Sequence, residues 1–128
     1  MPKFSSASLH KIATLDPRLQ RILRAAIVGG PDFTIISAKR TPAEQAALVA
    51  EGKSQTLKSL HLAEPSLAVD LAPWPLDWND TARFHLLAGW VLAHAAVLGI
   101  GVRWGGDWDH DWLLTDQRFH DLGHFELL

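Results

Sequence analysis

The chain has 128 residues, of which 48% are hydrophobic, and this is enough to bury the core of one domain of ordinary size. Its 12 basic and 14 acidic side chains give a net charge of −2 without a long basic run, so the composition does not indicate a nucleic-acid groove or a basic membrane face. Because the chain has no cysteine, disulfides and thiolate metal sites are excluded.

Two stretches of the sequence bear on where the protein is located in the cell. The amino-terminal residues 1–8 lack the apolar run of a secretory signal peptide, so we expect synthesis in the cytoplasm. The longest apolar stretch, residues 86–102, is broken by His94 and three glycines and is patterned on one face. We therefore expect a core helix there, and no membrane insertion.

In the first half of the chain, two helices and one strand are predicted. Asp16-Pro17 starts the first helix, whose apolar residues recur at helical spacing until Gly29: Leu19, Ile22, Leu23, Ala26 and Ile27. The β-branched segment Phe33–Ser37 predicts a central strand. Thr41-Pro-Ala-Glu44 is a capping box, which predicts a second helix from about residue 42 to residue 51.

The second half predicts one long helix and three more short strands. Residues 53–60 are polar and without period, and Leu67–Leu71 is a short strand with Asp70 at its centre. A surface turn with Trp74 and Trp78 leads to the third helix, capped by Asn79 or Asp80 and ended by Gly99. Strands follow at 101–104 and 125–128. We expect an α+β fold, a small antiparallel sheet packed against about three helices, in one domain spanning 1–128 without a separate wall-binding module.

His61, Asp70 and His124 are the candidate metal ligands. Two imidazoles and one carboxylate form the ligand set of a catalytic zinc site that keeps its fourth position for water. A carboxylate in an apolar strand is costly unless it is paired or bound to a cation. Each residue alone also has a commoner explanation, such as a buried His satisfied by one hydrogen bond. His85 and His94 lack a partner at ligand spacing and are predicted to be ordinary surface or edge residues.

A second acidic group, Asp107, Asp109 and Asp111, alternates with aromatic and His residues in a Gly-led loop. Alternating acids can present oxygens to calcium, but the aromatic and His residues between them leave no EF-hand glycine. A solvated turn is the favoured interpretation, and a calcium site is the alternative.

Four segments together resemble the bacteriophage L-alanoyl-D-glutamate endopeptidases: Ser59-Leu-His61, Ala68-Val-Asp-Leu71, Gly105-Gly-Asp-Trp108 and Phe119-His-Asp-Leu-Gly-His-Phe-Glu-Leu127. That family belongs to the D-alanyl-D-alanine carboxypeptidase-like zinc peptidases, which share their site architecture with the Hedgehog signalling domain. The resemblance runs in family order from about Ile35 to the carboxy terminus, and its motifs are specific only when they are taken together.

The resemblance implies a role for each matching residue. It implies that His61, Asp70 and His124 bind Zn2+ in a cleft on the sheet, and that Asp121 activates a water molecule. It further implies that Arg40, at a strand-to-helix corner, stabilises the oxyanion and that Ser59 lies beside the substrate. Without the resemblance, a surface salt bridge is the preferred interpretation of Arg40. We expect Lys39, next to Arg40, to add a cation that meets the D-Glu carboxylate of the substrate.

The sequence departs from the family pattern at three places. The span between His61 and Asp70 is longer than usual around residues 64–66, Ala38-Lys39 stands where Gly and an aromatic residue are common, and Gly123 stands where Pro is common. These differences concern contacts with the substrate and leave the metal ligands in place.

The function implied by the resemblance is a zinc-dependent murein endopeptidase that hydrolyses the L-Ala–D-Glu bond of stem peptides. We expect a monomeric phage lysin, released to peptidoglycan by a holin, or a peptidase carried by the virion. Two alternatives stay open: a D-Ala-D-Ala carboxypeptidase, and a non-catalytic zinc-stabilised binding domain. The first would release free D-Ala, and the second would need no acid at Asp121.

Overall fold

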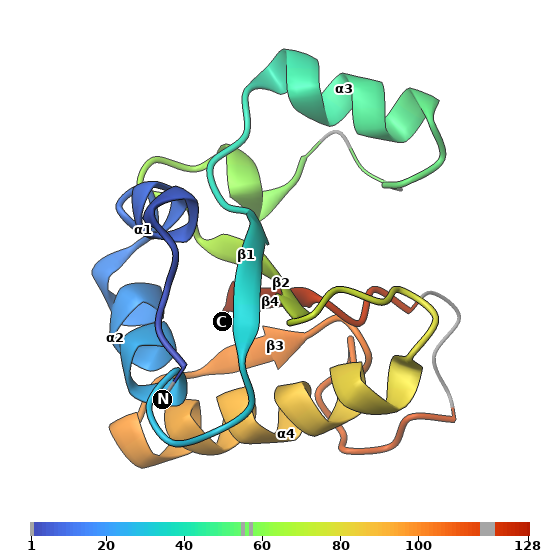
Figure 1. Cartoon of the computed structure of the whole chain (residues 1–128). Helices are drawn as coiled ribbons and strands as arrows, with labels where there is room; N and C mark the ends of the chain where they lie inside the picture. Colours follow the sequence, from blue (N-terminus) through green and yellow to red (C-terminus); the bar gives the residue numbers. More distant parts are fainter. Residues whose placement is uncertain (1, 55, 57, 116–119) are drawn as a thin grey trace.

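The computed structural model describes residues 2–54, 56, 58–115 and 120–128, and this part of the chain forms four α-helices and a four-stranded antiparallel sheet, with α3 (Pro42–Ala50) standing away from the sheet (Figure 1). The elements in chain order are α1 (Ser6–Ile12), α2 (Pro17–Ala26), β1 (Phe33–Ser37), α3 (Pro42–Ala50), the 3-10 helix η1 (Leu60–Leu62), β2 (Ala68–Pro73), α4 (Thr81–Leu98), β3 (Val102–Trp104) and β4 (His124–Leu127). The strand order is β1-β2-β4-β3, and the predicted α+β class is confirmed.

The helices begin where the capping residues predict. Asp16 accepts a hydrogen bond from the backbone N–H of Arg18 at the start of α2. Thr41 and Glu44 make both hydrogen bonds of the capping box at the start of α3. Asp80, not Asn79, caps α4, which ends at Gly99 with a φ of 71°, in the left-handed region that favours glycine.

Two features differ from the predicted elements. Helix α1 was not predicted. Its seven residues bury only Ser8 and Ile12, so they show no apolar period that would indicate a helix. Strand β1 lies at an edge of the sheet and not at its centre, so that prediction was wrong. The outer edge of β1 is covered by α1: Ser8 Oγ accepts from the backbone N–H of Ile35, and Lys11 Nζ donates to the carbonyl oxygens of Ile35 and Ile36.

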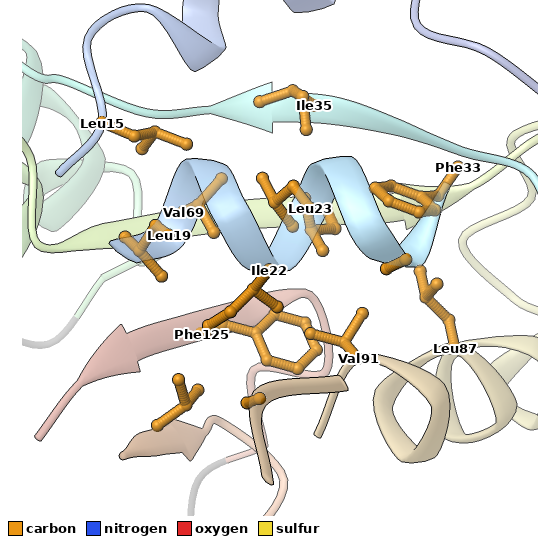
Figure 2. Close-up of a cluster of buried hydrophobic side chains, with 14 of the residues drawn as sticks. Leu15, Leu19, Ile22, Leu23, Phe33, Ile35, Val69, Leu87, Val91 and Phe125 are labelled. Carbon is orange, nitrogen blue, oxygen red and sulfur yellow. The ribbon is translucent and has the colours of Figure 1, made fainter. Parts of the chain in front are cut away.

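The two faces of the sheet have opposite characters. Alternate side chains of β2 and β4, among them Val69, Leu71 and Phe125, point to one face and meet the apolar stripe of α2 (Figure 2). Helix α2 lies beside α4 on this side of the sheet (Figure 1), and Leu19, Ile22 and Leu23 are among its buried residues. The residues between them in sequence, including Asp70, His124 and Glu126, face the other side, so one strand pair builds both the core and the candidate site.

Helix α4 packs against α2, β2 and β3 through a stripe of buried residues: Phe84, Leu87, Ala88, Val91 and Ala95. Its 18 residues and mean hydropathy of 1.2 also satisfy the length and composition of a membrane-spanning helix. In this structure the helix forms part of the core, which is where the one-sided pattern of residues 86–102 predicts it.

Candidate active site

Asp70 and His124 are brought together by the pairing of two strands. They are directly opposite each other in the antiparallel register of β2 and β4, where side chains on one face have Cβ atoms about 4.5–5.5 Å apart. Asp70 Oδ1 lies 3.1 Å from His124 Nδ1. The backbone ladder of the sheet therefore sets this half of the group.

His61 completes the group from η1. Its ring is fully buried, and Nδ1 donates a hydrogen bond to the carbonyl oxygen of Ala38 over 2.6 Å. Its Nε2 lies 3.3 Å from Asp70 Oδ1, outside hydrogen-bond geometry, and has no hydrogen-bond partner among the described residues. Since a buried nitrogen without a partner is unfavourable, the site fits a metal ion that this nitrogen would bind.

The three residues could hold a metal ion with one atom each, and these atoms lie within 4.8 Å of one another. His124 Nε2 hydrogen-bonds Glu126 Oε1 over 2.8 Å, which leaves Nδ1 facing Asp70. Both rings are thus oriented by a bond from their other nitrogen, His61 to a carbonyl and His124 to a carboxylate. Outer bonds of this kind fix the tautomer of metal-binding histidines in proteins.

Arg40 holds the second oxygen of Asp70. Its Nη2 donates to Asp70 Oδ2 over 2.5 Å, while Nε donates to Ser37 Oγ and Nη1 to Gln45 Oε1, each over 3.0 Å. Because Oδ2 is occupied in this way, Oδ1 turns to the two histidines. The guanidinium therefore orients the carboxylate and adds a positive charge to the wall of the site.

The ionisation of the group follows from its hydrogen bonds. Burial alone would raise the pKa of Asp70, but the hydrogen bond with His124 and the nearby imidazole of His61 hold the pKa of that carboxyl well below its usual range. Burial opposes the protonation of His124, but the carboxylates of Asp70 and Glu126 raise the pKa of its imidazole to about 9. The carboxylate of Asp70 and the imidazole of His124 thus stabilise each other's charged forms.

Asp121 lies at the edge of the same site, and the backbone on both sides fixes it. Its N–H donates to the carbonyl oxygen of Gly105 over 2.9 Å, and its own carbonyl accepts from the N–H of His124 over 3.0 Å. Burial, and then the negative charge of Asp70, raise the pKa of the Asp121 carboxyl. A carboxyl with a raised pKa is a better proton acceptor, which suits a general base.

A cavity of about 860 Å³ opens over these groups. Its wall includes Asp70, His124, Asp121 and Arg40, and it continues along residues 53, 54, 56 and 58–60. Trp78 and Trp108 line it as well, and the Trp108 and His124 ring centroids are 5.2 Å apart. A cavity of this size with convergent polar groups on one wall is typical of a ligand-binding site.

The family model of the phage L-alanyl-D-glutamate peptidases matches residues 1–128. This chain belongs to that family. It is 35% identical over 136 residues to the L-alanyl-D-glutamate peptidase of Escherichia phage T5, and the match covers 98% of each chain. Its structure resembles the crystal structure of the Serratia marcescens L-Ala D-Glu endopeptidase ChiX, with a TM-score of 0.78 and 31% identity over 98% of this chain and 89% of that one. The predicted family is confirmed, and the chain is an enzyme, a peptidase.

In this peptidase the structure brings together six of the seven residues that the sequence singled out. His61, Asp70 and His124 meet, and Arg40, Asp121 and Ser59 line the same cavity. Ser59 Oγ also caps η1 by accepting from the N–H of His61 over 3.1 Å. Phe119, the first residue of the carboxy-terminal motif, lies outside the described residues.

Lys39 has a different position in this peptidase. It does not line the cavity, and its Nζ donates to the carbonyl oxygens of Leu62 and Ala63 over 2.6 Å and 3.1 Å. Glu64 lies 3.9 Å away. In this structure Lys39 therefore binds the backbone of residues 62 and 63 at the end of η1. Its contact with a substrate carboxylate stays a prediction.

The carboxylates of Asp107, Asp109 and Asp111 lie close enough to share one ion. Asp107 also accepts hydrogen bonds from the backbone N–H groups of Asp111 and Trp112, over 3.2 Å and 2.8 Å. These bonds explain the buried Asp107 as the centre of a turn, and the calcium alternative stays untested.

Three residues of the site of this peptidase were not singled out from the sequence. Glu126 follows His124 by two positions, which places both on the same face of a strand, and that spacing was the available signal. Gln45 is fully buried in α3 and bonds Arg40, but nothing in its alanine-rich surroundings marks it. Trp78 was identified as a turn residue, although it lines the cavity.

Proposed function

We propose that this peptidase is a zinc-dependent murein endopeptidase that hydrolyses the L-Ala–D-Glu bond of stem peptides, with His61, Asp70 and His124 as the zinc ligands. The observation that carries the proposal is that Asp70 Oδ1 lies 3.3 Å from His61 Nε2 and 3.1 Å from His124 Nδ1, at a cavity whose wall includes Asp70 and His124. Two nitrogen ligands and one oxygen ligand suit zinc, whereas magnesium and calcium prefer oxygen alone.

Zinc, when bound, supplies a Lewis acid that polarises the scissile carbonyl and lowers the pKa of water. Asp121 accepts the proton of the attacking water and returns it to the leaving amine, a task that its raised pKa favours. Three of the five N–H donors of Arg40 are hydrogen-bonded within the described residues, so two remain for the developing oxyanion.

The substrate contacts belong to the same proposal. Ser59 lies on the wall of the cavity and is proposed to contact the peptide beside the scissile bond. Lys39 is proposed to meet the D-Glu carboxylate, which requires its amine to leave the carbonyl oxygens of Leu62 and Ala63. We further propose that the chain acts as a single monomeric domain on peptidoglycan, made in the cytoplasm and released by a holin.

Asp121→Asn is the decisive variant, because it keeps the shape of the side chain and removes the base. We expect it to fold, to retain its metal and to hydrolyse purified murein at least about a hundredfold more slowly, the usual contribution of general acid–base help. Asp32→Asn, outside the cavity, is the matched control and should keep wild-type activity. Elemental analysis of both variants checks the metal.

The products separate this function from its rivals. Amino-group labelling of digested murein should reveal new D-Glu amino termini. Free D-Ala in their place would establish a carboxypeptidase, and a zinc-loaded wild type without hydrolysis would establish a binding domain. Near wild-type rates for Asp121→Asn would remove Asp121 from the mechanism.

A further inference from the structure

Trp78 presents an aromatic ring to solvent in the turn between β2 and α4. Its exposed fraction is 58%, and it stacks on Phe84 with ring centroids 5.6 Å apart and an angle of 21° between the ring planes. Phe84 is itself buried in α4. The stacking covers one face of the Trp78 ring and fixes its orientation, so the ring is held as a platform.

The position of Trp78 makes this platform part of the site. Trp78 lines the cavity that also contains Asp121 and His124. Trp74, in the same turn, is 53% exposed but does not line the cavity. Both tryptophans are therefore exposed, but of the two only Trp78 lines the cavity that contains the reacting groups.

The charges that line the cavity are unevenly distributed. The Lys and Arg side chains on its wall are Arg40, Lys53 and Lys58, and no Lys or Arg lines the cavity beyond residue 58 in the described part of the chain. Arg40 precedes α3 in the chain, and Lys53 and Lys58 follow it. In Figure 1, α3 lies at the top, while the chain that joins β2 to α4, which includes residue 78, runs lower, on the right. The cavity thus has a cationic side and an aromatic side.

The chemistry of the substrate has the same asymmetry. In murein the nitrogen of L-Ala is acylated by the lactyl group of a muramic acid, while D-Glu and the residues after it carry carboxylates. The carboxylates match the side with Lys53 and Lys58. The uncharged L-Ala end, with the sugar one residue away from the scissile bond, then lies on the side of Trp78.

We propose that Trp78 forms a subsite for the sugar that carries the stem peptide, so that this peptidase cleaves glycan-linked stem peptides in preference to free ones. The C–H groups on one face of a pyranose ring pack on the face of an aromatic ring, and such contacts are individually weak. The inference rests on the function proposed above and adds the class of substrate.

Two purified substrates test the subsite: the disaccharide-linked tripeptide, and the same tripeptide after an amidase has removed the sugars. We expect the wild type to prefer the glycan-linked substrate about three- to tenfold in kcat/KM, chiefly through KM, as suits one aromatic contact. Trp78→Ala should reduce this preference to near unity, and Trp78→Phe should retain part of it. Trp74→Ala, the matched control, should keep the wild-type preference.

Equal kcat/KM for both substrates in the wild type would overturn the subsite while leaving the proposed function standing. An equal loss on both substrates in Trp78→Ala would overturn it as well, since that result is expected of a structural residue. A wild type that cleaves neither substrate would end the proposed function and this inference together. Thermal unfolding of each variant shows that the comparison is made on folded protein.

Discussion

The two sides of the candidate site are held in place by different means. On the sheet side, Asp70 and His124 are neighbours because β2 and β4 pair in one register, so backbone hydrogen bonds set their separation. On the helix side, His61 and Arg40 are positioned by individual hydrogen bonds from their side chains. The sheet side therefore tolerates changes in its surroundings, whereas the helix side depends on each of its few polar contacts.

Helix α3 shows this dependence most clearly. Gln45 is its one fully buried residue, whereas α2 and α4 bury apolar stripes. Its amide accepts from Arg40 and donates to Ser54 Oγ over 2.9 Å and to the carbonyl oxygen of Thr56 over 2.7 Å. A segment with few buried apolar contacts opens locally more easily than the core. We therefore expect the helix side of the site to open before the sheet side.

The largest effect is expected from removing a metal ligand on either side. His124→Ala and His61→Ala should each lose bound zinc and reduce hydrolysis by about a thousandfold or more, because a zinc site with two protein ligands is incomplete. Elemental analysis after gel filtration measures the metal. His85→Ala, on the exposed face of α4, is the control. Full zinc content in both ligand variants would end the assignment.

A steric change next to Asp121 should come second. A Cβ at Gly105 would overlap the carbonyl oxygen of Asp121, so Gly105→Ala displaces the general base. A shift of about 1 Å in a catalytic group can cost about a hundredfold in rate, and we expect a loss of that order with zinc retained. Gly89→Ala has open space around it and should leave activity unchanged. Equal activity in the two variants would show that the position of Asp121 is not critical.

A change at Glu126 tests the sheet side while all three proposed metal ligands are kept. Glu126→Ala removes the acceptor for His124 Nε2 and should weaken zinc binding about 10- to 100-fold, while Glu126→Gln, which still offers an oxygen, should lose less. Competition with a chelator measures the affinity. At saturating zinc we expect near wild-type rates, because the register of β2 and β4 still places His124. Unchanged affinity in Glu126→Ala would remove its orienting role.

The smallest effect is expected from Gln45, and it should be confined to the helix side. Gln45→Ala leaves Arg40 short of one acceptor and should lower the free energy of unfolding by about 1–3 kcal/mol and the rate by about tenfold. Hydrogen exchange should speed up in α3 and stay unchanged in β2 and β4. The control is Gln20→Ala in α2, which removes a hydrogen bond to the carbonyl oxygen of Leu15 and should not alter exchange in α3. Faster exchange in the strands of Gln45→Ala would contradict the contrast between the two sides.

The same contrast explains how far the sequence predicts this molecule. An acid in an apolar strand and a His before a second apolar run are local signals, so Asp70 and His124 stood out, although their direct opposition depends on a register that no single strand encodes. Gln45 was missed because its importance lies in residues that become neighbours only after folding. The metal ligands were named with the help of a family resemblance, since spacing alone leaves commoner explanations open.

The edge position of β1 was missed for a related physical reason. An apolar, β-branched segment predicts a central strand, and β1 is covered along both of its edges, by β2 and by α1. Its second cover is a helix, α1, whose seven mostly polar residues carry no period that predicts it. The sequence of β1 therefore describes its surroundings correctly but does not reveal which element provides them.

The contact between α1 and β1 also bears on how molecules of this peptidase meet one another. A free edge strand is a template on which a strand of another molecule can pair, and this is a common route to aggregation. Ser8 and Lys11 occupy the outward N–H and C=O groups of Ile35 and the C=O of Ile36 with side-chain atoms. A strand of a second molecule therefore cannot form backbone hydrogen bonds with these groups of β1. The first helix thus blocks the pairing of two sheets along this part of β1.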